Sequence, residues 1–154
     1  MVRHLKRKNP FMIFLLGVVT LSFYFYYMLF DNMKRINRLK NIAIFNVEKR
    51  VTIFASAFVL GTIAMSIIRS NACQIDGEML VNISNILNVS FLLLIIYNVV
   101  SLVIEIKTIQ KSAGMKKTIS TSTAALLTFL FMFSFPYIQS HINMMIDTKV
   151  VIEE

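Results

Sequence analysis

Apolar and polar residues follow one another along this chain in long blocks, not in short periods. Four blocks contain no Lys, Arg, Asp or Glu, and they cover residues 11–30, 51–68, 79–104 and 118–138. A helix needs roughly 20 apolar residues to cross a bilayer, so each block is about long enough. The pattern predicts an all-α membrane protein, a bundle of four hydrophobic helical segments within a single integral membrane domain, 1–154.

The polar stretch between the first two blocks has a pattern of its own. Met33, Ile36, Leu39 and Ile42 recur at three-residue steps between residues 31 and 50. This spacing predicts a short basic amphipathic connector helix lying along the membrane surface. The other interpretation is a solvated helical extension of the first segment. A second basic connector, residues 105–117, follows the third block, and Gly114 is its expected break.

Composition supports the membrane class and changes the meaning of the charge. The chain is 56% hydrophobic and only 16% charged, with a formal net charge of +8. Because the basic residues flank apolar blocks, they indicate orientation and contact with anionic lipids, and no nucleic-acid partner is expected. The candidates for anionic-lipid contact are Lys34, Arg35, Arg38 and Lys40.

The distribution of basic residues raises a question of topology. The N-terminal tail holds four Lys or Arg residues and the first connector holds six, so the positive-inside rule predicts that both are cytoplasmic. Four full crossings would place them on opposite sides. The first block could instead break near Gly17–Ser22 and return, or it could run straight through; this choice and the side of the C-terminus stay open. Its length and bulky end disfavour a cleaved signal peptide.

Polar residues inside the blocks are uncharged, which disfavours a coupled transporter. Asn82, Asn85 and Asn88 share one broad helical face, and Asn98 lies further along the same block. Amides in lipid seek partners on neighbouring helices, so these four are candidates for helix packing or for lining a polar path. A small-residue stripe at Ala57 and Gly61 is a further packing candidate.

The stretch "FPYIQSHIN", residues 135–143, closes the fourth block. We expect Pro136 to kink the end of that segment. Tyr137, Gln139 and Asn143 are candidates for an interface or a docking edge against the surface helix. His141 is expected to be a solvated interfacial residue.

Candidate reactive chemistry is sparse. The chain has one cysteine, Cys73, and two histidines, so neither an intrachain disulfide nor a clustered metal site is expected. No nucleophile–base arrangement or glycine-rich phosphate loop is recognisable. We therefore expect no cofactor and no enzymatic activity.

Two stretches carry a family resemblance. The opening "KRKNPFMIFLLGVVTLSFYFYYMLFDNMKRIN" and the closing "PYIQSHIN" resemble a bacterial family of small multi-pass membrane proteins, domain of unknown function 4234. The chain departs from the family pattern at Ser22, where glycine is common, and at Tyr26–Tyr27, where tyrosine–tryptophan is usual. The resemblance implies a bacterial inner membrane and no particular chemistry.

These observations favour one class of function. We expect a small multi-pass inner-membrane protein of interaction or accessory type, such as a membrane subunit, an immunity-like protein or an envelope factor. Its N-terminus and basic connectors would be cytoplasmic, and it would bind a membrane protein partner or form a homo-oligomer. The alternative is a small oligomeric pore or holin-like channel in which the asparagines line a water path.

Overall fold

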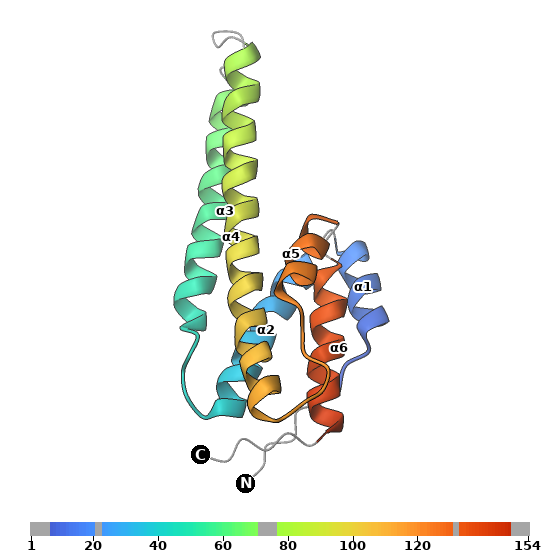
Figure 1. Ribbon diagram of the computed structural model, residues 1–154. Helices are drawn as coiled ribbons and strands as arrows, with labels where there is room; N and C mark the ends of the chain where they lie inside the picture. Colours follow the sequence, from blue (N-terminus) through green and yellow to red (C-terminus); the bar gives the residue numbers. More distant parts are fainter. Residues whose placement is uncertain (1–6, 21–22, 71–76, 131–132, 149–154) are drawn as a thin grey trace. The chain divides into compact units, whose positions relative to one another are not determined.

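The computed structural model describes residues 7–20, 23–70, 77–130 and 133–148. These ranges contain six helices and no strands: α1 (Pro10–Val19), α2 (Phe23–Lys40), α3 (Val47–Ser70), α4 (Gly77–Ser112), α5 (Thr121–Phe129) and α6 (Ser134–Asp147) (Figure 1). By length and composition alone, two of them, α3 and α4, are long and apolar enough to cross a membrane. Cys73 lies outside the described residues.

The chain divides into two compact units. The hairpin unit is Asn46–Tyr97, and the bundle unit joins Met1–Phe45 to Asn98–Glu154. The continuous helix α4 contributes to both units.

In the hairpin unit, α3 and the first part of α4 lie side by side (Figure 1). The ring of Phe91 packs between those of Phe54 and Phe58, with centroid distances of 4.9 and 6.1 Å. The guanidinium of Arg50 lies 5.3 Å from the ring centroid of Tyr97. The rest of the apolar surface is open, because only 6% of the most apolar stretch of α3 is buried.

The bundle unit is organised around α6, which packs against α1, α2 and α5, while α1 also packs against α2. The last part of α4 adds to the same core. The largest fully buried side chains of this unit are Ile13, Met28, Leu29, Met33, Ile36, Leu102, Ile106, Ile109, Ile119, Phe135, Ile138 and Ile142.

The first and fourth apolar blocks are not single helices. Block 11–30 divides between α1, which ends at Val19, and α2, which begins at Phe23. Block 118–138 divides between α5, which ends at Phe129, and α6, which begins at Ser134. The predicted bundle of four continuous segments is therefore not confirmed, while the break considered for the first block is present.

Local sequence explains where these helices begin. Asn9 caps α1, since its side chain accepts a hydrogen bond from the Phe11 amide at 2.9 Å, and Pro10 occupies the first turn. Pro136 likewise lies in the first turn of α6, where a missing N–H costs no helical hydrogen bond. The expectation that Pro136 kinks a longer helix was wrong, because the helix starts just before it.

The predicted amphipathic connector helix does not exist as a separate element. Residues 31–40 continue α2 without a break. Met33 and Ile36 are fully buried in the bundle unit, whereas Leu39 is half-buried and Ile42 is 63% exposed, so only the first half of this apolar stripe faces protein. Asn41, with φ of 52°, then turns the chain, as asparagine does more readily than most residues.

The break predicted at Gly114 is confirmed. Gly114 has φ of 65° and lies two residues after the end of α4 at Ser112. Its amide donates to the Lys111 carbonyl at 3.0 Å, and the Met115 amide donates to the Gln110 carbonyl at 3.0 Å. This pair of bonds is the Schellman arrangement, which favours glycine at that position.

Candidate functional site: amide clamps in the bundle unit

Three of the polar side chains of α6 that the sequence singles out are buried within the bundle unit. Gln139 is fully buried, and His141 and Asn143 are 6% and 5% exposed. The expectation that His141 is solvated was wrong. Instead of lying at an interface with water, His141 is on a helix that packs against α1, α2 and α5.

Asn143 binds the backbone of the N-terminal tail in both directions. Its Nδ2 donates to the Lys8 carbonyl at 2.6 Å, and its Oδ1 accepts from the Lys8 amide at 3.3 Å. Gln139, one turn earlier, donates from Nε2 to the same Oδ1 at 2.8 Å. The side chain of Asn143 thus replaces water for both backbone groups of a non-helical residue.

Asn37 on α2 repeats this arrangement with the first connector. Its Nδ2 donates to the Phe45 carbonyl at 2.7 Å, and its Oδ1 accepts from the Phe45 amide at 2.9 Å. Phe45 is itself buried. The connector between α2 and α3 is therefore fixed at its far end by one amide side chain.

Gln110 on α4 binds the stretch that connects α4 to α5. Its Oε1 accepts from the Ile119 amide at 2.7 Å, while its Nε2 lies 3.3 Å from Nδ1 of His141 and 3.4 Å from the His141 carbonyl. A neutral imidazole with an unprotonated Nδ1 fits this donor. Burial, with a smaller contribution from the charge of Lys117, lowers the pKa of His141, so both effects favour that neutral form.

Tyr137 on α6 also binds the stretch that connects α4 to α5. Its hydroxyl oxygen accepts from the Ser120 amide at 3.0 Å, and its ring meets the His141 ring edge-on at 4.8 Å. Ser120 in turn caps α5 by accepting from the Thr123 amide at 3.3 Å. The start of α5 is thereby attached to α6.

Ion pairs lie beside these amide clamps. Asp31 Oδ2 accepts from Lys8 Nζ at 3.0 Å and from Arg35 Nε at 2.9 Å. Lys40 on α2 pairs with Glu105 on α4 at 2.9 Å. Of the four predicted lipid-contacting residues, Arg35 and Lys40 are thus engaged by carboxylates, whereas Lys34 and Arg38 are exposed.

The four candidate asparagines separate into two groups. Asn82, Asn85 and Asn88 are exposed on α4 in the hairpin unit, and their side chains make no hydrogen bond with any residue that the structure describes. Asn98 is buried in the bundle unit. Ala57 is exposed, and a Cβ added at Gly61 would meet nothing within 4 Å, so among the residues that the structure describes no close helix packing occurs at this stripe.

The amide side chains of Asn37, Gln110 and Asn143 bind backbone N–H and C=O groups of this chain, and this is the chemistry that the site shows. Within the described ranges, no three His, Cys, Asp or Glu side chains gather as a metal ion would require. Asn37 and Gln110 were not among the sequence candidates. Each lies within a basic, polar stretch where an amide gives no periodic signal, so only the contact with a connector reveals its role.

The fold and the site define an all-helical protein with two helices that could span a membrane. No protein-family model matches the chain, and comparisons with curated proteins and with solved structures find no match.

Proposed function

We propose that this protein is a small multi-pass membrane protein that acts by binding another membrane-embedded helix. The observation that carries the proposal is the open apolar surface of the hairpin unit. A core helix of a soluble protein is mostly buried, whereas 6% of the most apolar stretch of α3 and 33% of that of α4 are buried. The charge-free run of 26 residues from 79 to 104 extends about 39 Å as a helix, enough for a hydrocarbon core of about 30 Å.

The exposed amides on α4 support the interaction part of the proposal. Asn82, Asn85 and Asn88 lie at three-residue steps inside the charge-free run and are exposed. In lipid an amide gains free energy by pairing with a polar group on another helix. A partner helix, from another protein or from a second copy of this chain, would supply those groups.

Site-specific photocrosslinking tests this interaction. A photoreactive residue at Val89, which is 54% exposed on α4, should give a discrete adduct in membranes. At about 0.6 kcal/mol for each amide, replacing all three asparagines with leucine should weaken association about 20-fold. The control is Thr62→Val on α3, because the Thr62 hydroxyl already bonds to its own helix at the Phe58 carbonyl.

Several outcomes of this experiment would refute the proposal. An adduct that is absent, or one that the three leucines leave unchanged, contradicts a partner at this face. Release of the protein from membranes by alkaline carbonate contradicts the membrane location itself.

A pore is the second candidate, because the same three amides could line a water path in an oligomer. Purified protein in planar bilayers would then give discrete conductance, and Asn85→Leu would abolish it. Conductance without any crosslinked partner would replace the interaction function by the pore.

We also propose a bacterial inner-membrane location with the basic connectors cytoplasmic, where anionic lipids attract Lys and Arg. Lys34 and Arg38 are the exposed pair on α2. Their joint replacement by glutamine should reduce the ratio of phosphatidylglycerol to phosphatidylcholine among the lipids that stay bound to the protein purified in mild detergent. Lys40→Gln should have a smaller effect, since Lys40 is paired with Glu105.

A further inference from the structure

Two short helices of the bundle unit are too short to cross a bilayer. α1 has 10 residues and α5 has 9, which correspond to about 15 and 14 Å of helix. These lengths match one leaflet of a hydrocarbon core of about 30 Å. Each short helix is followed by a turn and by a helix that returns, α2 and α6 respectively (Figure 1).

Thr20, at the end of α1, binds backbone groups on both sides of the turn that follows. The Thr20 hydroxyl donates to the Leu16 carbonyl at 2.8 Å and accepts from the Tyr24 amide at 3.0 Å. The Thr20 amide also donates to the Leu16 carbonyl, and the Phe23 amide donates to the Thr20 carbonyl at 3.1 Å. Backbone in lipid must find its partners within the protein, and Thr20 provides such partners for the amides of Phe23 and Tyr24.

Apolar and exposed side chains flank the two turns where the structure describes them. Val19 and Phe23 flank the first turn, and Leu130 and Phe133 flank the second; all four are exposed. The Phe133 ring stacks on Phe14 of α1 with a centroid distance of 4.9 Å. The two helix–turn–helix elements therefore pack together and present an uncharged surface at the same end of the unit.

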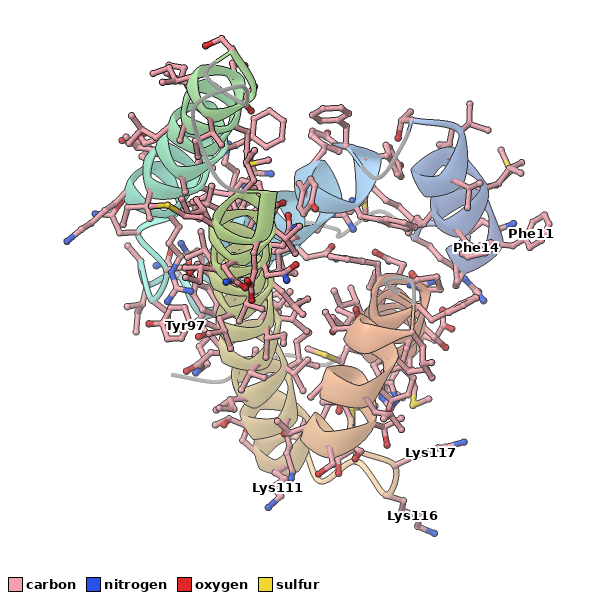
Figure 2. All side chains as sticks on the ribbon, turned by 90° about the horizontal axis from the view of Figure 1, so that it is seen from above. Phe11, Phe14, Tyr97, Lys111, Lys116 and Lys117 are labelled. Atoms are coloured by element: carbon pink, nitrogen blue, oxygen red, sulfur yellow. The ribbon has the colours of Figure 1, made fainter. Side chains whose placement is uncertain are left out.

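Charged residues begin at the other end of the same helices. Along α2 the first is Asp31, eight residues after Phe23, or about 12 Å from the turn. Near that end lie the ion pairs of Asp31 and the pair that joins Arg7 before α1 to Asp147 at the end of α6. Lys111, Lys116 and Lys117 extend away from the ribbon at the end of α4 and in the connector that follows (Figure 2).

We propose that the bundle unit inserts both turns into a single leaflet and crosses the bilayer with neither α1–α2 nor α5–α6. This inference rests on the proposed membrane location. The occupant of the exposed apolar surface around α1 is lipid hydrocarbon, and the charged end lies at the headgroups. Both flanks of each helix–turn–helix element are then on one side, which removes the conflict between the two basic stretches and the positive-inside rule.

Single-cysteine labelling tests this topology in the full chain carrying Cys73→Ser. Val19→Cys and Leu130→Cys report the two turns, and both positions are exposed, so the substitutions should not disturb the core. Lys34→Cys and Lys111→Cys report the charged end. A membrane-impermeant maleimide is added to sealed vesicles of each orientation, with and without detergent.

The expected pattern is specific. The two turn positions should label in neither orientation and only after detergent is added, while the two lysine positions should label in the same orientation. Labelling of Val19→Cys or Leu130→Cys from the side opposite to Lys34→Cys would show a full crossing and overturn the inference. Labelling from the same side would place the turns in water and overturn it equally.

A second measurement separates this inference from the proposed function. Ile63→Cys lies on α3 and is exposed in the chain, so a membrane-spanning α3 protects it from the reagent. If Ile63→Cys is protected while the turns label, only the single-leaflet insertion fails. If Ile63→Cys labels in intact vesicles and carbonate extracts the protein, the membrane location fails as well.

Discussion

Gly17→Ala should destabilise the bundle unit although alanine is the better helix former. A Cβ atom on Gly17 would overlap the ring of Phe25. That ring cannot move away easily, because Phe25 is 2% exposed and stacks on Phe135 at 5.1 Å with an interplanar angle of 9°. The substitution therefore acts on the contact of α1 with α2 and, through Phe135, with α6.

The expected magnitude is the difference between two opposing effects. Overpacking of a filled core costs about 1–3 kcal/mol, whereas glycine to alanine inside a helix gains up to about 1 kcal/mol. Taking a cost of about 2 kcal/mol from the middle of the first range and a gain of about 0.8 kcal/mol, the net loss is about 1.2 kcal/mol, which lowers the Tm of a chain of this size by about 2–5 °C.

Thermal unfolding followed by circular dichroism in mild detergent measures this effect, with two comparisons. Gly61→Ala is the matched control, because a Cβ there meets nothing within 4 Å; it should leave the Tm unchanged or raise it. Phe25→Leu shortens the obstructing ring, so the double variant with Gly17→Ala should be more stable than the sum of the two single effects. A Tm for Gly17→Ala at or above that of the parent protein, or additive effects in the double variant, would refute the reasoning.

Three further predictions concern polar contacts and use the same unfolding measurement. Thr20→Val removes the acceptor of the Tyr24 amide and should lower the free energy of unfolding by about 1–3 kcal/mol. Thr62→Val on α3 is the control and should be close to neutral, because the Thr62 hydroxyl only donates to the Phe58 carbonyl of its own helix. Equal effects of the two substitutions would contradict the role of Thr20 in the turn. Asn143→Leu removes the partner of the amide and of the carbonyl of Lys8 and should cost about 1–3 kcal/mol. The Lys8 amide should then exchange faster with solvent, and unchanged exchange would contradict the clamp. Burial lowers the pKa of His141 in the fold, so the unfolded chain binds the proton more tightly than the folded chain does. The free energy of unfolding should therefore fall as the pH drops below about 6.5. If His141→Gln shows the same pH dependence, another group is responsible for it.

Hydropathy predicted the two central helices, α3 and α4, because a long run of apolar residues is what defines each of them. Blocks 51–68 and 79–104 lie inside α3 and α4, and their apolar residues need no particular neighbour within the chain. Charge-free length is sufficient to predict that such helices exist, but it does not give their ends. The helix α3 already begins at Val47, within the first connector, and α4 continues past the charge-free run to Ser112.

The same measure could not divide the other two blocks. A turn built by Thr20 keeps the surrounding residues apolar, so mean hydropathy does not change across it. Pro136 did carry the information, since proline favours the first turn of a helix, but within a long apolar block it was interpreted as a late kink. Gly17 was considered as part of the break, whereas it lies inside α1 and makes room for Phe25.

The amide clamps show why the roles of the polar residues in the bundle unit could not be predicted from the sequence. Asn37, Gln110 and Asn143 each bind backbone from a different non-helical stretch, at Phe45, Ile119 and Lys8. Such a contact depends on which connector passes the helix, and sequence spacing along the helix does not encode that. Side-chain amides suit this task because one group offers both a donor and an acceptor, which lets a single residue pair the N–H and C=O of a connector. If the turns enter the leaflet as we propose, the clamps fix the connectors at the headgroup end, so that the orientation of the unit is set by rigid contacts as well as by charge.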